Sequence, residues 1–144
     1  MRAHKPITIY LAGAIRDGHP EDIEWREQIV AAFEALPVRI LNPLGGKSFD
    51  PETKQWSVCG IPSTAKLIVK HDFYSVDESD VIVFNFRALS QKYPNIGTLI
   101  EFGRATRHAL LYSIVDPDYT GHENAAMFQL HPFIEQNSVA TFTT

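Results

Sequence analysis

Apolar and polar positions alternate along the chain with two different periods, which predicts strands followed by helices. Five runs rich in apolar and β-branched residues are typical of buried strands, and they span residues 7–12, 38–41, 81–86, 109–115 and 138–142. Three stretches between them repeat their apolar positions at helical spacing, and they span residues 20–36, 63–76 and 98–105. Strands that alternate with helices predict a parallel sheet with right-handed crossovers.

Each predicted helix has an apolar face that we expect to point inward. In the first helix, which Pro20 begins and Pro37 ends, this face holds Trp25, Ile29, Phe33 and Leu36. In the second, which Ser63 caps, it holds Ala65, Ile68, Val69, Phe73 and Val76. In the third, which Thr98 caps, it holds Leu99, Ile100, Phe102 and Ala105. Residues 47–62 have no clear period and are predicted to form a long loop.

These elements predict a single domain over residues 1–144, with a doubly wound five-stranded parallel sheet of order 2-1-3-4-5 and helices on both faces. In such a sheet the strand order reverses between the first and third strands, and ligands bind beyond the carboxyl ends of the strands at that point. The loops that follow Ala12 and Phe86 would flank this crevice. We expect four polar side chains to approach it: Tyr10, Asp72, Asn95 and Glu101.

Glu101 has two interpretations. Thr98 lies three residues before it, which is the spacing of a capping box at the start of a helix. Alternatively, a carboxylate in the first helical turn after a buried strand would lie at the ligand-binding edge of the sheet, where Gly103 would keep space open.

Asp72 falls on the apolar face of the second predicted helix. A buried carboxylate without partners costs several kcal/mol, so this position needs an explanation. Asp72 either caps a neighbouring loop through strong hydrogen bonds or points into a half-open pocket.

Composition and charge restrict the class of protein. The 144 residues are 44% apolar and 21% charged, as in an ordinary soluble domain, and the net charge of −4 gives no reason to expect a nucleic acid or a membrane as partner. Cys59 is the only cysteine and cannot form an internal disulfide. With no secretory segment and no apolar run long enough for a membrane span, we expect a cytoplasmic protein.

Several motifs for cofactors and metals are missing or incomplete. Residues 45–48 resemble the end of a phosphate-binding P-loop, but Leu41 stands where its first glycine belongs. The dinucleotide motif Gly-x-Gly-x-x-Gly is absent, and the six histidines lack the spacing of a metal site. We therefore expect neither a metal nor an organic cofactor, and interpret Cys59 as a small apolar residue.

Four fragments together resemble the nucleoside 2-deoxyribosyltransferase family. They are Ile-Tyr-Leu-Ala-Gly-Ala at 9–14, Asn-Pro-Leu at 42–44, Asp72 with Asp80 eight residues later, and Gly-Thr-x-x-Glu-x-Gly-x-Ala at 97–105. Their order and spacing cover essentially the whole chain. The resemblance implies a flavodoxin-like fold and the exchange of a purine or pyrimidine base on deoxyribose through a covalent glycosyl-enzyme.

The resemblance also implies roles for individual residues. Glu101 would be the nucleophile that attacks C1′ of the sugar, as in retaining glycosidases, and Tyr10 would hold it in place through its hydroxyl. Asp72 would bind the sugar hydroxyls or orient the base. Gly13 and Gly97, in the matched motifs, would belong to the substrate site.

Asn95 is a departure from the family pattern. It stands six residues before the nucleophile, where similar family members have an aspartate that contacts the base and aids its protonation. Asparagine hydrogen-bonds a base edge but delivers no proton at neutral pH, so a water or Asp72 would take that role.

The family completes each pocket with residues from a neighbouring subunit. Asn124 matches an asparagine that reaches across to the sugar, and Met127 matches a methionine close behind it; the alternative is an ordinary surface loop. The resemblance thus implies a homo-oligomer, dimer-based and up to a tetramer or hexamer, which binds deoxynucleosides and free bases.

Two other functions fit the same residues. A hydrolase of nucleoside 5′-monophosphates would share the scaffold but have a serine for the phosphate near residues 95–97, whereas Ser90 lies too early. A non-catalytic nucleotide-binding domain is the third hypothesis. The sequence leaves open which bases are accepted and whether ribose is tolerated, a choice that the predicted loop at 47–62 would govern.

Overall fold

The central sheet of the computed structural model is parallel throughout. The structure describes residues 5–16, 19–45, 47–53, 55–58, 61–62, 64–86, 96–105, 107–114 and 134–136. The strands of this sheet are β1 (Ile7–Gly13), β2 (Val38–Leu41), β6 (Val81–Asn85), β7 (Leu110–Ile114) and β8 (Ile134–Gln136). They lie in the order β2-β1-β6-β7-β8, and every neighbouring pair is parallel. The predicted parallel α/β sheet is confirmed, but the strand beside β7 is β8, and the predicted strand at 138–142 lies outside the described residues.

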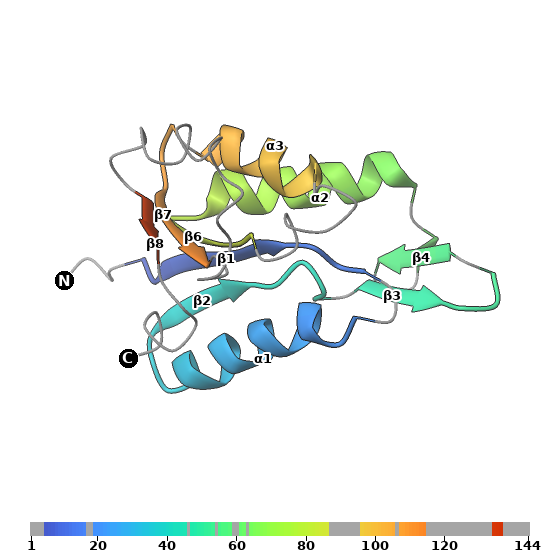
Figure 1. The fold of residues 1–144 in the computed structure, drawn as a ribbon, viewed down its shortest axis with the longest axis horizontal. Helices are drawn as coiled ribbons and strands as arrows, with labels where there is room; N and C mark the ends of the chain where they lie inside the picture. The colour runs from blue at the N-terminus through green and yellow to red at the C-terminus, as the bar shows by residue number, and fades with distance from the viewer. Residues whose placement is uncertain are drawn as a thin grey trace.

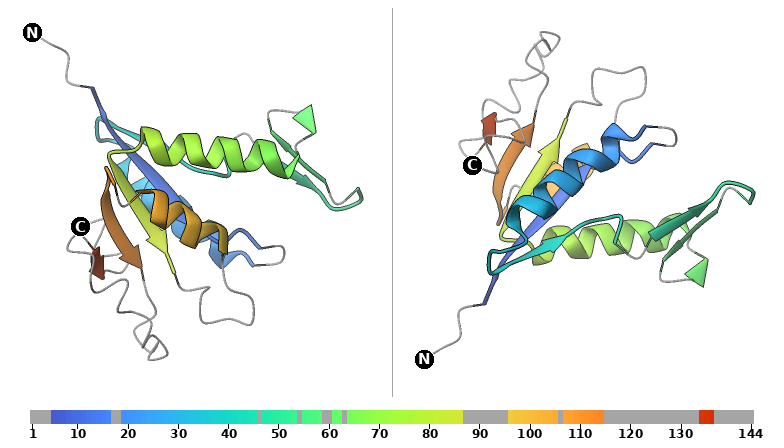
Figure 2. Two further views of the ribbon diagram at one scale, coloured as in Figure 1. Left: turned by 90° about the horizontal axis from the view of Figure 1, so that it is seen from above. Right: turned by 90° about the horizontal axis from the view of Figure 1, so that it is seen from below.

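Helices cover both faces of this sheet. Helix α1 (Glu21–Phe33) lies on one face, and α2 (Ala65–Glu78) and α3 (Ile96–Ala105) lie side by side on the other (Figures 1 and 2).

Two predicted helix boundaries were wrong. Thr64, not Ser63, caps α2, because its side chain accepts a hydrogen bond from the backbone N–H of Leu67. Helix α1 ends at Phe33, so Leu36 lies beyond it and is exposed.

Alternation along β1 divides the core between the two faces. Ile9 and Leu11 pack with Trp25 and Ile29 under α1. Tyr10 and Ala12 belong to the cluster on the α2 and α3 side, which also contains Val76, Ile82, Phe84, Phe86, Phe102, Ala105 and Leu111. Because successive side chains of a strand point to opposite faces, the phenol of Tyr10 is directed towards the layer that carries Glu101.

The inward face of α3 differs from the predicted one. Its buried residues are Thr98, Glu101, Phe102 and Ala105, a stripe at the i, i+3, i+4, i+7 spacing of an amphipathic helix. Leu99 and Ile100 were predicted to point inward and are exposed, as is Val69 on α2. The prediction failed because two positions of the buried stripe are polar.

None of the helices among the described residues has both the length and the apolar character of a membrane span.

Residues 47–62 were predicted to be a loop, and this was wrong. They contain β3 (Lys47–Asp50), β4 (Gln55–Val58) and β5 (Ile61–Pro62), which form a small antiparallel sheet in sequence order. The turn between β3 and β4 is closed by Asp50, whose Oδ1 accepts from the backbone N–H of Glu52 at 2.8 Å. The β3–β4 hairpin lies beyond the carboxyl end of β2 (Figure 1).

Candidate active site

A cavity of about 230 Å³ lies beyond the carboxyl end of β1, between the hairpin and the amino-terminal parts of α2 and α3. It is lined by Gly13, Ile15, Lys47, Ile68, Asp72, Gly97, Thr98 and Glu101. Four of the predicted site residues therefore meet there, namely Gly13, Asp72, Gly97 and Glu101. Lys47 also lines the cavity and was missed as a site residue, because it was considered only as part of the incomplete P-loop motif at 45–48 and its segment has no clear period.

Glu101 is placed at the cavity by the packing of α3. The next residue, Phe102, inserts its ring edge-on against Phe84 and Phe86, with centroids 5.3 and 5.7 Å away. This contact anchors α3 on β6 and fixes the rotation of the helix. Glu101 is consequently held against the sheet, 9% exposed, with its carboxylate at the cavity wall.

The capping-box interpretation of Glu101 was wrong. Helix α3 begins at Ile96, so Thr98 lies within the helix and is buried, and Glu101 lies in the second turn. Gly103 was expected to keep space open, yet it is exposed, and a Cβ added there would have no atom within 4 Å. The orientation of Glu101 therefore does not come from capping its own helix.

Tyr10 contacts the nucleophile candidate directly. Its hydroxyl donates to Oε1 of Glu101 at 3.1 Å in a buried hydrogen bond, which is the contact predicted for this pair. Burial, and after it the negative charges of Glu101 and Asp72, raise the pKa of Tyr10 well above its usual value. Tyr10 therefore keeps its proton and acts as a permanent donor to the carboxylate.

The surroundings of Glu101 act on its charge in opposite directions. Burial, followed by the charge of Asp72, raises the pKa of Glu101 to about 7. The hydrogen bond from Tyr10 and the positive charges of Lys47 and Arg26 oppose this shift. At neutral pH the carboxylate therefore exchanges between its protonated form and its nucleophilic, ionised form.

Asp72 has both a partner and access to the cavity. Lys47 donates from Nζ to Oδ1 of Asp72 at 2.7 Å, and the two side chains are 4% and 19% exposed. Nδ1 of His71 lies 3.3 Å from the same oxygen. The pairing with Lys47 explains how a carboxylate is tolerated on the inner face of α2.

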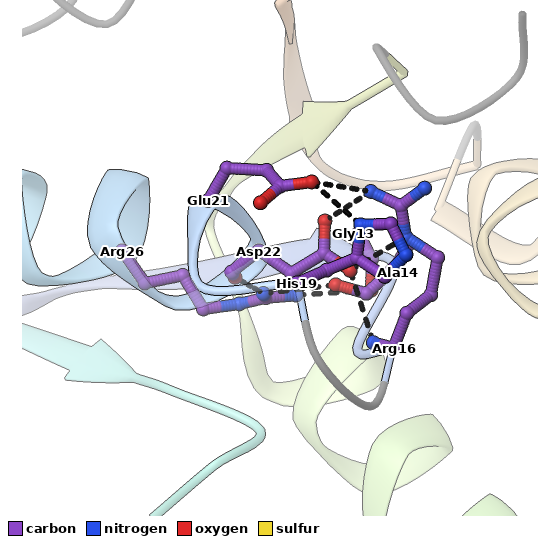
Figure 3. A network of polar contacts seen from close by, with 7 residues as sticks. All are labelled: Gly13, Ala14, Arg16, His19, Glu21, Asp22 and Arg26. Carbon is purple, nitrogen blue, oxygen red and sulfur yellow. Dashed lines mark hydrogen bonds and ion pairs between the residues drawn. The ribbon is translucent and has the colours of Figure 1, made fainter.

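The loop after β1 forms one wall of the cavity and is held by a buried arginine (Figure 3). The guanidinium of Arg26 donates to the backbone carbonyls of Gly13 at 2.9 Å and Ala14 at 3.1 Å, and also to those of Leu11 and Asp22. Burial lowers the pKa of Arg26 to about 10, so it is still charged at neutral pH. Arg26 thus fixes the loop and leaves a positive charge behind the cavity.

A second arginine, Arg16, connects the same loop to α1. Arg16 forms a two-pronged ion pair with Asp22, with Nε to Oδ2 and Nη2 to Oδ1 both at 2.7 Å, and its backbone N–H donates to Oδ2 at 2.9 Å (Figure 3). Asp22 therefore ties the loop to the first turn of α1.

Gly13 is required by close approach. A Cβ at this position would lie 3.2 Å from Cβ of Asn85, 3.2 Å from the ring of Trp25 and 3.4 Å from Nη2 of Arg26. The absence of a side chain lets β1 and the loop pass between these groups.

Three predicted site residues, Asn95, Asn124 and Met127, lie outside the described residues, as does Cys59. Within the described ranges, no group of three or more histidine, cysteine, aspartate or glutamate side chains is arranged to hold a metal ion. The described walls offer a buried carboxylate with its phenol donor, and an ammonium–carboxylate pair.

Comparisons with known proteins point to one family. A family model described as "Nucleoside 2-deoxyribosyltransferase like" matches residues 6–119. No curated protein is a significant match to the sequence.

Solved structures that are similar in fold include the following three. A 2-desoxiribosyltransferase from Leishmania mexicana matches with a TM-score of 0.56 and 20% identity, over 76% of this chain and 65% of that protein, just under two thirds of its length. A conserved protein from Enterococcus faecalis V583 matches with a TM-score of 0.59 and 15% identity, over 96% and 84% of the two chains. A CMP N-glycosidase from Clostridium botulinum matches with a TM-score of 0.61 and 11% identity, over 94% and 93%. At these identities the similarity establishes the fold.

Proposed function

The chain belongs to the nucleoside 2-deoxyribosyltransferase-like family, and on this premise we propose that it is an enzyme that transfers 2-deoxyribose between purine or pyrimidine bases. The parallel strand order β2-β1-β6-β7-β8, with helices on both faces, supports a flavodoxin-like fold for it. The observation that carries the proposal is the buried Glu101, which faces the cavity and accepts a hydrogen bond from Tyr10.

The proposed reaction proceeds in two displacements. An oxygen of the ionised Glu101 attacks C1′ of the deoxynucleoside, and the electrons of the breaking C–N bond go to the departing base. The sugar is then held as an ester of Glu101. A nitrogen of a second base attacks C1′ from the vacated side and releases the carboxylate, so the configuration at C1′ is retained. Tyr10 keeps the carboxylate oriented and stabilises its ionised form before each attack.

The remaining predicted residues would position the substrate. Asp72 binds a sugar hydroxyl or orients the base from its place beside Glu101, and Gly13 and Gly97 form flat walls that admit the sugar. The cavity of about 230 Å³ is smaller than the roughly 300–1,000 Å³ of sites for larger ligands. Its described walls therefore suit the sugar and the reacting bond, and Asn95 would contact the base beyond them.

The protein would work as a homo-oligomer. Helices α2 and α3 both expose large apolar side chains, among them Ile96 and Ile100, which are 62% and 53% exposed. Exposed apolar side chains that gather on one face mark an interaction surface. In an assembly through this face, Asn124 and Met127 of one subunit would complete the pocket of another.

A second candidate function is hydrolysis of a nucleoside 5′-monophosphate. The observation that favours it is the similarity in fold to a CMP N-glycosidase over nearly the full length of both chains. The charges of the cavity favour the transferase. Its described walls carry the carboxylates of Asp72 and Glu101 and one ammonium, Lys47, which is already paired, so a phosphate dianion would meet unfavourable charge there.

Two incubations distinguish these functions. With deoxyinosine and cytosine, the transferase produces deoxycytidine and hypoxanthine; with dCMP in water, the hydrolase releases cytosine. Glu101→Ala should abolish product formation in either case, whereas Glu27→Ala, an exposed control on α1, should leave it unchanged. Normal turnover in Glu101→Ala contradicts the nucleophile assignment. Ligand binding without turnover in the wild type indicates a non-catalytic nucleotide-binding domain.

A further inference from the structure

We propose that Lys47 is a catalytic residue, whose ammonium group donates a hydrogen bond and then a proton to the departing base. This inference rests on the proposed function, because it assigns a step in the same reaction. It answers the question raised by Asn95, whose side-chain amide has no proton to deliver to the base.

Lys47 is built into the reaction site. It is the first residue of β3, at the base of the hairpin, and its side chain is 4% exposed. Its side chain lines the same cavity as Glu101, although the two residues belong to separate elements, β3 and α3. A lysine side chain is seldom buried unless it is paired or has a function.

The ammonium group has donors left for a ligand. Among the residues that the structure describes, its one hydrogen-bond partner is Oδ1 of Asp72, at 2.7 Å. An ammonium carries three N–H donors, so two remain for a base at the cavity. Asp72 aims the ammonium, and as a carboxylate that accepts this charged hydrogen bond it has no proton of its own to give.

The other proton-bearing groups near the cavity are less suited to this step. His71, whose Nδ1 lies 3.3 Å from Oδ1 of Asp72, is not among the residues that line the cavity, and the hydroxyl of Thr98 does not ionise at neutral pH. The hydroxyl of Tyr10 donates to Glu101. The guanidinium of Arg26 donates to backbone carbonyls behind the loop wall, and an arginine does not release its proton. Of the three ionisable residues among the described cavity walls, Glu101 is the nucleophile and Asp72 the acceptor, which leaves Lys47 as the proton donor.

The proton balance closes over one exchange. As Glu101 forms its bond to C1′, the C–N bond electrons move onto the base, and Lys47 passes one proton to it and becomes a neutral amine. The base leaves neutral, and the charge of the site is unchanged, because one carboxylate has become an ester and one ammonium an amine. The incoming base returns a proton to the Lys47 amine as its nitrogen attacks C1′, and Glu101 is released as a carboxylate.

The test compares two leaving groups. Deoxyinosine needs a proton on its departing base, whereas 7-methyl-2′-deoxyinosine already carries positive charge on the base and leaves without one. Base release is measured in a single turnover for the wild type, Lys47→Met and Lys47→Arg. Lys66→Met serves as the control, because Lys66 is an exposed lysine in the first turn of α2.

Lys47→Met should slow base release from deoxyinosine about 10²- to 10⁴-fold, the usual contribution of general acid catalysis, and slow release from the methylated substrate less than about 10-fold. Lys47→Arg keeps the positive charge beside Asp72 but cannot give up a proton. It should therefore stay slow with deoxyinosine, and Lys66→Met should match the wild type with both substrates.

A purely structural role for Lys47 predicts a different pattern. Equal loss on both substrates in Lys47→Met, full recovery in Lys47→Arg, or no loss in either variant overturns the proposal. If Lys47→Met does not fold, as circular dichroism would show, the comparison of Lys47→Arg with the wild type on the two substrates decides. Failure of the proposed function itself is seen separately, as absence of deoxyinosine cleavage in the wild type.

Discussion

Glu101 combines burial, which favours its neutral form, with groups that favour its charge. Burial and Asp72 raise its pKa to about 7, while Tyr10, Lys47 and Arg26 hold it from rising further. A nucleophile needs the ionised form, and a dry site strengthens each interaction that the carboxylate makes with its neighbours. In the proposed mechanism, the balance among these groups would therefore set the activity as well as part of the stability of the protein.

The first residue-scale prediction concerns the pH dependence of activity. In the proposed mechanism Glu101 must be ionised to attack C1′, so kcat/KM should rise with pH through about 7. Tyr10→Phe removes a hydrogen bond that lowers the pKa of Glu101, so this rise should move to higher pH. Profiles of kcat/KM from pH 5 to 9 test this, with the exposed Tyr74→Phe as control. A rise that stays in place or moves to lower pH contradicts the role given to Tyr10.

The second residue-scale prediction concerns stability. The pKa of Glu101 in the folded protein, about 7, is above the ordinary value of 4.5, so between these values the folded state binds more protons than the unfolded state. Its contribution to stability is therefore fully present below about pH 4.5 and is lost as the pH rises through about 7. Glu101→Gln should raise the free energy of unfolding at pH 8 by on the order of 2–3 kcal/mol, with little change at pH 4.

Urea unfolding at the two pH values measures this difference. Glu27→Gln, at an exposed position of α1, should change the free energy of unfolding little at either pH. A Glu101→Gln variant that is less stable than the wild type at pH 8 would show that the folded state favours the charged carboxylate, contrary to the account of its burial.

At the scale of elements, the site depends on how the loop after β1 is fixed. Arg26 reaches back from α1 to the carbonyls of Gly13 and Ala14, and Asp22 holds Arg16 at the other end of the loop. Gly13 then passes so close to its neighbours that an added Cβ would be crowded on three sides. Residues 13–16 of the cavity wall are therefore tied directly to the first turns of α1.

The element-scale prediction is that Arg26→Met destabilises the protein. It removes the guanidinium that donates to the buried carbonyl of Leu11 and to the partly buried carbonyls of Gly13 and Ala14, and should lower the free energy of unfolding by on the order of 3 kcal/mol. Arg39→Met, at an exposed position of β2, should change it by less than about 0.5 kcal/mol. Equal denaturation midpoints for the two variants would mean that the Arg26 contacts do not hold the loop.

The elements also show how far a sequence of this kind can be interpreted. The long apolar run before Asn85 and the helical spacing of Trp25 and Ile29 predicted the parallel sheet and the buried face of α1 correctly, because each pattern extends over several residues. Strands β3 and β4 are four residues long and alternate too briefly to be distinguished from a loop. Lys47 was missed with them.

In the candidate site, buried polar residues made the sequence-based prediction of the inward helix face fail. Thr98 and Glu101 occupy the buried stripe of α3, so the apolar pattern pointed to Leu99 and Ile100 instead. The approach of Asp72 and Glu101 to one cavity follows from the sheet topology and could be predicted, and Gly13 and Gly97 were predicted from the family resemblance. The pairing of Lys47 with Asp72 joins residues 25 positions apart across two elements, and no local pattern encodes it.

At the scale of the whole molecule, the described cavity of about 230 Å³ is smaller than the proposed substrate needs, and α2 and α3 both expose large apolar side chains. Assembly through these helices would bury the exposed side chains of both and bring a second chain towards the cavity. The proposed oligomer therefore links the surface of the protein to the completion of its active site.

The prediction at this scale is that Ile100→Lys weakens assembly and lowers activity. A lysine on the apolar face would have to be buried in the interface, so the mass measured by light scattering should fall towards that of one 16.2 kDa chain. Ile23→Lys, at an exposed position of α1 on the opposite side of the sheet, should leave the mass unchanged. A wild type that is fully active as a monomer contradicts a pocket shared between subunits.

The covalent sugar on Glu101 is the central claim, and mass spectrometry of the trapped intermediate tests it most directly. A 2-fluoro-2-deoxyribosyl nucleoside should transfer its sugar to the enzyme. The fluorinated sugar should then leave the enzyme slowly, because fluorine destabilises the oxocarbenium-like transition state. The account predicts one fluorinated sugar per chain, which peptide mapping places on Glu101, and none in Glu101→Gln. An adduct on another residue, or no adduct in an enzyme that turns over deoxyinosine, would contradict it.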